Sequence, residues 1–173
     1  MLEQEFLYTT KMISTNLANF SAWHQRSKLA PRLLSERKAD DKARRAFMEH
    51  EFEQSLEALY TDPFNESVWV YHAWLMSNIL PSSPQSEPIA SYTEEESLQE
   101  LNRQIDNLKE LLELETECTH VYAALIRYAT SLTTQVKERE QEIKSWLSNL
   151  IRLDPLRRGR WNDLAESLFK TEG

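Results

Sequence analysis

Two octets of the sequence carry one pattern: NFSAWHQR at residues 19–26 and NESVWVYH at residues 65–72. Asparagine, serine and tryptophan coincide when the first octet is shifted by 46 residues (69 − 23). The same shift carries Phe6 onto Phe52, in the helix-period apolar stretches that precede the octets. The repeating unit is therefore predicted to be a helix, a capped turn, and a second helix with a large aromatic residue in its first turn.

Fainter copies of this unit continue toward the C-terminus. Twice the shift, 92 residues (161 − 69), carries Trp69 onto Trp161 and the Asp-Pro pair at 62–63 onto the pair at 154–155. A weaker copy places Tyr122 at the aromatic position. A single hairpin cannot bury its apolar face, whereas stacked hairpins can. We therefore expect an all-α protein, a right-handed α-α superhelix (solenoid) of stacked antiparallel helical hairpins.

This register divides the chain into three parts. The expected parts are two repeats within residues 1–80 (about 2–34 and 45–80), a Pro/Ser linker at 81–93, and two divergent hairpins at 94–170 that close the solenoid. Three prolines and three serines between Leu80 and Pro88 predict a mobile surface connection, and Thr93 or Ser91 is expected to cap the helix that follows. The charged stretch 34–41 is expected to be loose and only partly ordered.

Composition excludes several classes of protein. Only 2 of the 173 residues are glycine, which argues against a Gly-rich phosphate loop or a dinucleotide-binding fold, because both need glycine where φ is positive. The chain has 20 basic and 28 acidic residues and a formal charge of −8, whereas a nucleic-acid binder is usually basic. It has no apolar run long enough for a transmembrane segment, and its acidic N-terminus is unlike a signal peptide, so we expect a cytoplasmic protein.

No catalytic, cofactor-binding or metal-binding residue is predicted in this chain. The single Cys118 excludes a disulfide framework and a cysteine zinc cluster, and no positioned base is evident beside it. The carboxylates fall on predicted solvated helix faces rather than in a buried pair. The histidines lack the i, i+4 spacing with an intervening acid that a helical zinc site requires. These are His24, His50, His72 and His120.

Two groups of side chains allow alternative interpretations. Indoles can form a stacking groove for bases or a lipid, but Trp23, Trp69 and Trp161 fit the repeat register, so we expect them to pack between hairpins. Two basic clusters, at 26–45 and 152–160, either complement an acidic partner surface or only favour helix C-termini.

The two octets resemble the repeat signature of protein prenyltransferase α subunits, an N-x-S-x-W-x-x-R type motif, although position 72 is histidine where the motif usually has arginine. The stretches 60–63, 69–75 and 153–157 are most similar to one branch, the α subunit of Rab geranylgeranyltransferase (type II). The similarity starts at the fourth family repeat and is looser after Pro88, so we expect the C-terminal half of such a subunit.

This resemblance implies a crescent of hairpins that wraps a catalytic β subunit as its partner in a heterodimer. The β subunit would hold the zinc and most of the isoprenoid pocket. The complex would transfer geranylgeranyl from its diphosphate to C-terminal cysteines of Rab GTPases, which an escort protein presents. The α-subunit groups that approach the diphosphate lie in earlier family repeats, so this chain alone is expected to be inactive. The signature residues, which are also a candidate β-subunit interface, are Asn19, Ser21, Trp23, Arg26, Asn65, Ser67, Trp69, His72, Asp154 and Trp161.

Two alternatives stay open. The α subunit shared by farnesyltransferase and geranylgeranyltransferase type I has the same hairpin and much of its motif. A non-catalytic helical-repeat scaffold of the tetratricopeptide type would bind a protein partner with no link to lipid transfer, but its repeat of about 34 residues is shorter than the one found here. Without the earlier hairpins the first hairpin would expose apolar surface, so the lone chain is expected to be marginally stable.

Overall fold

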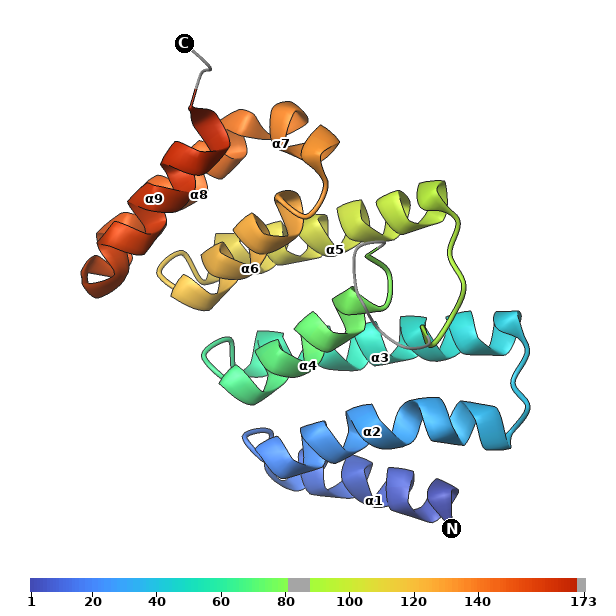
Figure 1. Ribbon diagram of the computed structural model, residues 1–173. Coiled ribbons are helices and arrows are strands. Elements are labelled where there is room, and N and C mark those ends of the chain that lie inside the picture. Colours follow the sequence, from blue (N-terminus) through green and yellow to red (C-terminus); the bar gives the residue numbers. More distant parts are fainter. Residues whose placement is uncertain (81–87, 171–173) are drawn as a thin grey trace. The chain divides into compact units, whose positions relative to one another are not determined.

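The protein is helical over most of the residues that its structure, a computed structural model, describes: 1–80 and 88–170 (Figure 1). These ranges contain no β-strand, which confirms the all-α prediction. The chain forms two compact units, Met1–Asn102 and Arg103–Gly173, and the boundary between them falls inside α5. The helices are α1 (Leu2–Thr15), α2 (Phe20–Glu36), α3 (Asp41–Thr61), α4 (Glu66–Ser77), α5 (Glu94–Leu114), α6 (Thr119–Ala129), α7 (Thr133–Glu138), α8 (Glu140–Leu153), the short 3₁₀ helix η1 (Pro155–Arg157) and α9 (Arg158–Phe169).

Unit 1 contains two helical hairpins, α1–α2 and α3–α4, which pack together through α2 and α4 (Figure 1). An asparagine caps the second helix of each hairpin. Asn19 Oδ1 accepts a hydrogen bond from the backbone N–H of Ala22 at 3.1 Å, and Asn65 Oδ1 accepts one from that of Ser67 at 3.1 Å. The hairpins and the capped turns predicted from the two octets are therefore confirmed.

A large aromatic residue ties each of these turns to the helix that follows it. The Trp23 Nε1–H donates to the backbone oxygen of Leu17 at 2.8 Å, and the Trp69 Nε1–H donates to that of Pro63 at 2.7 Å. The two acceptors are 46 residues apart (63 − 17), so the hydrogen bond recurs with the sequence repeat. Both indoles are buried, with 3% and 8% of their surface exposed, which confirms the packing interpretation.

In unit 2 too, a large aromatic side chain near the start of a helix donates a hydrogen bond to the preceding turn, at Tyr122 and at Trp161. The Tyr122 hydroxyl donates to the backbone oxygen of Thr116 at 2.8 Å, again six residues earlier in the chain (122 − 116). Trp161 is buried like the other two indoles, but its Nε1–H donates to the Asp154 carboxylate at 3.3 Å. Tyr122 therefore stands in for tryptophan, as the weaker repeat copy predicted.

Helix α8 lies between α6 and α9 in the packing of unit 2. It buries one apolar stripe, formed by Ile143, Trp146, Leu147 and Leu150. The short helix α7 is an element that the hairpin register did not predict. Its six residues are mostly polar and are too few to show a helical apolar period.

The connection 34–41 is ordered, which corrects the expectation of a loose stretch. Helix α2 continues through Leu34, which is 2% exposed, and Arg37 is paired with a carboxylate of α1. Asp40 caps α3 by accepting a hydrogen bond from the backbone N–H of Ala43 at 2.8 Å. The charged side chains that suggested a loose stretch instead end one helix and begin the next.

Residues 81–87 of the predicted linker lie outside the described residues, so its mobility stays a prediction. After them, Ile89 is buried in unit 1, where its backbone N–H donates to Asn78 Oδ1 at 3.1 Å and its carbonyl accepts from an arginine of α3 at 3.1 Å. Thr93 caps α5 as predicted. The Glu96 backbone N–H donates to Thr93 Oγ1 at 3.2 Å, and the Thr93 N–H donates back to the Glu96 carboxylate at 2.8 Å.

None of the helices within the described ranges 1–80 and 88–170 combines the length and apolar character needed to cross a membrane.

Candidate functional site

A buried ion pair joins the two hairpins of unit 1. Arg26 lies on α2 and Glu51 on α3, and the two side chains meet through parallel hydrogen bonds. The Arg26 Nε–H donates to Glu51 Oε2 at 2.7 Å, and its Nη2–H donates to Oε1 at 2.7 Å. Arg26 is 5% exposed and Glu51 is fully buried. Such a pair is stable only when its remaining polar atoms also have partners.

The remaining donors of Arg26 are satisfied by α1. Its Nη1 donates to Thr9 Oγ1 at 3.1 Å and to Thr10 Oγ1 at 2.8 Å, and its guanidinium carbon lies 4.0 Å from the centre of the Phe6 ring. Burial alone would lower the pKa of Arg26, but the Glu51 carboxylate outweighs this and raises the pKa above its ordinary value. The guanidinium therefore stays charged and connects α1, α2 and α3.

The Glu51 carboxylate receives a third hydrogen bond, from the Tyr71 hydroxyl of α4 at 2.5 Å. Burial, and then the adjacent carboxylate, raise the pKa of Tyr71 well above its usual value, so this phenol remains a neutral donor. The Tyr71 ring also packs on the Trp23 indole, with 4.8 Å between the ring centres. Four helices thus meet at one polar cluster, defined here as the Arg26 cluster: Thr9, Thr10, Arg26, Glu51 and Tyr71.

The second repeat has a different residue at the position of Arg26. His72 occupies the position equivalent to Arg26 (26 + 46) and is fully buried. Its ring packs edge-on against Phe52, with 5.7 Å between ring centres, and against Trp69, with 6.2 Å between ring centres. Histidine at the motif arginine position therefore packs its ring against two aromatic side chains.

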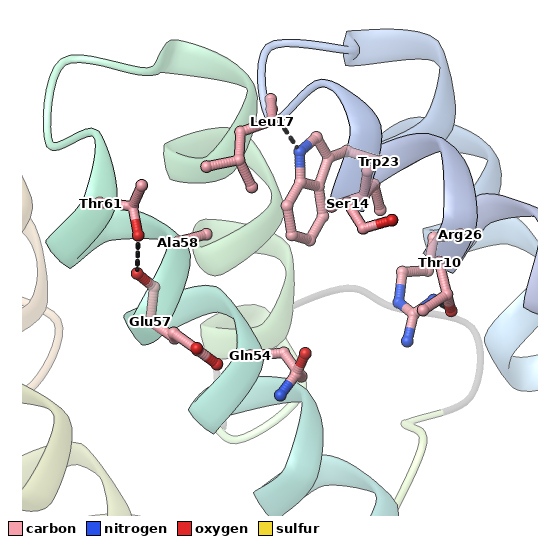
Figure 2. A pocket seen from close by; sticks show the side chains of 10 residues that line it. Thr10, Ser14, Leu17, Trp23, Arg26, Gln54, Glu57, Ala58 and Thr61 are labelled. Carbon is pink, nitrogen blue, oxygen red and sulfur yellow. Dashed lines mark hydrogen bonds between the residues drawn. The ribbon is translucent and has the colours of Figure 1, made fainter.

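A groove beside the Arg26 cluster separates α1 from α3, as Figure 2 shows. It has a volume of about 220 Å³. Figure 2 shows the Trp23 indole in its wall, Arg26 and Thr10 side by side at one end, and Glu57 along α3. Its lining residues, which define the α1/α3 groove, are Thr10, Ile13, Ser14, Leu17, Trp23, Arg26, Gln54, Glu57, Ala58 and Thr61.

The α1/α3 groove is suited to holding a side chain rather than to catalysis. Apolar atoms of Leu17, Trp23 and Ala58 supply contact area, while threonine, serine and glutamine side chains supply hydrogen-bonding groups. Arg26 and Glu51 are already committed to each other, so neither is free to act as an acid, a base or a nucleophile. In the part of the chain that the structure describes, no three His, Cys, Asp or Glu side chains form a group that could hold a metal ion.

Three apolar side chains near the starts of α2 and α4 are exposed. They are Phe20, Phe64 and Val70, at 54%, 58% and 56%, and the name α2/α4 face is used here for these three side chains. Ser67 Oγ lies 3.4 Å from the backbone oxygen of Ala18, so the starts of the two helices are near each other. Exposed apolar surface of this kind is typical of protein contact sites.

The structure separates the predicted signature residues into buried and accessible groups. Ser21 is exposed, and Asn19 and Ser67 are half-buried at the helix starts that carry the α2/α4 face. The buried signature residues of unit 1 can affect an interface only by positioning others; they are Trp23, Arg26, Asn65, Trp69 and His72. Asp154 and Trp161 belong to unit 2, where they bind each other. The role of these ten residues in a β-subunit interface stays a prediction.

Glu51 and Tyr71 were missed from the sequence, although both are essential to the Arg26 cluster. The available signal was an acidic residue directly before Phe52, on the face of α3 that also carries the buried Ser55. A carboxylate at such a position requires a buried cationic or hydrogen-bonding partner. Nothing in the spacing identifies Arg26 as that partner, because the two residues are 25 positions apart.

This chain is similar to one family of repeats and to several known proteins. The family model of the protein prenyltransferase alpha subunit repeat matches residues 2–33 and 48–79, two segments that begin 46 residues apart (48 − 2). The geranylgeranyl transferase type-2 subunit alpha of Schizosaccharomyces pombe is 37% identical over 97% of this chain and 51% of its own length. That of Saccharomyces cerevisiae is 28% identical over 95% of this chain and 49% of its own length. That of Homo sapiens is 34% identical over 45% of this chain and 14% of its own length. The chain thus spans about half the length of the two fungal relatives.

Proposed function

The chain belongs to the protein prenyltransferase alpha subunit repeat family, and from this we propose that it serves as the C-terminal portion of the α subunit of a Rab geranylgeranyltransferase. In this proposal, a catalytic β subunit transfers geranylgeranyl from its diphosphate to C-terminal cysteines of Rab proteins, and the present chain supports it in the cytoplasm. The similarity to a type-2 α subunit along 97% of the chain carries the proposal.

The contribution of this chain is structural, because its buried polar groups hold hairpins together. The charged groups of the Arg26 cluster satisfy one another. The proposal also places the zinc and the isoprenoid pocket in the β subunit, as the family resemblance implies, and gives the chain alone no transferase activity.

We assign the α2/α4 face to the β subunit. Phe20 and Val70 are each more than half exposed, and the helices that carry them, α2 and α4, pack against each other. The partner gains apolar burial there without any rearrangement of the hairpins. Replacing exposed side chains on this face should weaken binding without unfolding unit 1.

The decisive experiment is co-purification. We expect the 173-residue chain to elute with the β subunit of a type-2 geranylgeranyltransferase in size-exclusion chromatography, and the double variant Phe20→Glu, Val70→Glu to lose this co-elution. Leu156→Glu is the matched control, because Leu156 is 97% exposed and lies in unit 2. If the unmodified chain does not co-elute, the scaffold alternative is favoured and the proposal is wrong.

We propose that a second partner, the Rab escort protein, binds in the α1/α3 groove. This groove combines apolar contact area with polar groups at its rim and lies beside the rigid Arg26 cluster. Gln54→Arg and Glu57→Arg alter two exposed rim residues, so they should weaken escort-protein binding and leave β-subunit co-elution intact. Loss of both interactions in these variants would contradict the assignment of separate surfaces.

A further inference from the structure

Unit 2 contains a groove with a concentration of arginines. Its volume is about 320 Å³, and α6, the end of α8, η1 and α9 form its walls. Arg127 reaches it from α6, Arg157 from η1 and Arg160 from α9. We call it the arginine groove and define it by these three side chains together with Asp154, Ile126 and Trp161.

Among the described residues 1–80 and 88–170, the guanidiniums of Arg127 and Arg160 make no ion pair and no hydrogen bond. The Arg160 guanidinium instead lies over the Trp161 ring, 5.1 Å from its centre. Arg157 pairs with Asp154 at 3.3 Å, and its side chain remains 67% exposed. These guanidiniums therefore retain donors directed to solvent that a ligand can occupy.

The charge of the arginine groove is opposite to that of the whole chain. Three arginines and one aspartate line it, which gives +2 (3 − 1), whereas the chain as a whole carries −8. Arg37 and Arg45, in unit 1, each pair with a carboxylate. The excess of arginines in this groove, two of them with guanidiniums unpaired among the described residues, favours binding of a negatively charged ligand.

The wall of the arginine groove adds an apolar contact. Ile126 and Trp161 are 2% and 8% exposed, so they form a fixed apolar wall next to the charged side chains. Carboxylates match the planar fork of arginine through paired hydrogen bonds, and an apolar side chain can pack against the indole. Phosphate alone would use the arginines but leave the apolar wall unoccupied.

We propose that the arginine groove binds an acidic peptide segment of a protein partner. Carboxylates of the segment bind Arg127, Arg157 and Arg160, and one of its apolar side chains packs against Trp161. A nucleic acid is a poorer fit, because its affinity requires many phosphate contacts and the chain as a whole repels polyanions. The proposal does not depend on prenyltransferase function, since it concerns only residues of unit 2.

The test uses the 173-residue chain and a fluorescein-labelled peptide in which glutamates flank a central phenylalanine. Fluorescence anisotropy should show binding that weakens when salt is raised from about 50 mM to about 200 mM, because screening reduces the attraction. The double variant Arg127→Glu, Arg160→Glu should bind at least about tenfold more weakly. Arg158→Glu is the matched control and should change affinity less than about twofold, because Arg158 is exposed but does not line the groove.

A second measurement tests whether the peptide lies in the arginine groove. In a ¹H–¹⁵N NMR spectrum, the indole N–H of Trp161, which binds Asp154, should shift on addition of the peptide, while that of Trp69 should not. A peptide with lysines in place of glutamates should bind the double variant more tightly than it binds the unmodified chain. If the double variant and the Arg158→Glu control lost the same amount of affinity for the glutamate peptide, the proposal would be overturned. So would displacement of the peptide by an equimolar amount of inorganic phosphate or of single-stranded DNA.

Discussion

Replacement of Glu51 by leucine is the most direct test of the Arg26 cluster. The substitution removes the acceptor of two hydrogen bonds from Arg26, at 2.7 and 2.7 Å, and of one from Tyr71 at 2.5 Å. It leaves a guanidinium that is only 5% exposed with threonine hydroxyls as its acceptors. Removing one partner of a buried ion pair typically costs about 3 to 5 kcal/mol, so we expect a loss of that order in the free energy of unfolding.

The double variant Arg26→Met, Glu51→Leu separates this interpretation from a simple packing defect. Arg26→Met alone should cost about as much as Glu51→Leu, because it leaves a fully buried carboxylate with Tyr71 as its remaining donor. When both charged side chains are replaced by apolar ones, only hydroxyl groups lose hydrogen-bond partners. We expect this loss to lower the free energy of unfolding by about 1 to 3 kcal/mol. The double variant should therefore be no less stable than either single variant, and the coupling energy should be several kcal/mol.

Urea denaturation followed by far-UV circular dichroism measures these differences, provided that the dependence on urea is the same for all variants. Arg37→Ala is the control, because its ion pair with Glu3 is about half exposed and screened by solvent, so its removal should change the free energy of unfolding far less. Additive effects of the two single substitutions would refute the reasoning. A cost of less than about 1 kcal/mol for Glu51→Leu would do the same, because it would mean that water reaches the pair.

Three further predictions concern the turns and α5. Trp69→Phe keeps most of the ring but removes the hydrogen bond to Pro63, so the thermal midpoint should fall by an amount that corresponds to about 1 to 2 kcal/mol. Asn19→Ala removes the cap of α2 and should cost about 1 kcal/mol by urea denaturation, whereas glycine at this position should cost only a few tenths. The Arg45 hydrogen bonds lower the pKa of Glu96 from 4.5 to about 2, so the stability that this carboxylate contributes is present above pH 4.5 and is lost as the pH falls toward 2. The difference in thermal midpoint between the unmodified chain and Glu96→Gln should shrink over that range, and a difference that is constant with pH would exclude this linkage.

Local features of the sequence were enough to predict the hairpins of unit 1. Asn19 and Asn65 cap helices through contacts two or three residues away, and Trp23 and Trp69 bond to turns six residues earlier. Interactions of this range recur wherever the same residues recur, so a shift of 46 positions in the sequence identifies repeated structure. The family assignment follows from the same residues.

Order in the connections depended on contacts that the local pattern does not contain. The stretch 34–41 reads as charged and loose, yet Leu34 is buried and Arg37 is paired with Glu3, a residue 34 positions away in the chain. The buried Ile89 is held in the same way by Asn78 and by an arginine of α3. Composition indicates where helices are interrupted, but only packing determines whether the interruption is ordered.

The amino-acid sequence alone predicted a helical repeat protein, because the helix period, the caps and the indole positions are properties of neighbouring residues. The prenyltransferase α-subunit type came from the resemblance of its two octets to the repeat signature of that family. The tertiary structure decided which charges are neutralised inside the protein and which remain available. Arg26 finds Glu51 across a hairpin interface, whereas Arg127 and Arg160 face a groove without an acidic partner among the described residues. Arginines look alike in a sequence, and their roles differ because burial and the distance to a carboxylate exist only once the helices have packed.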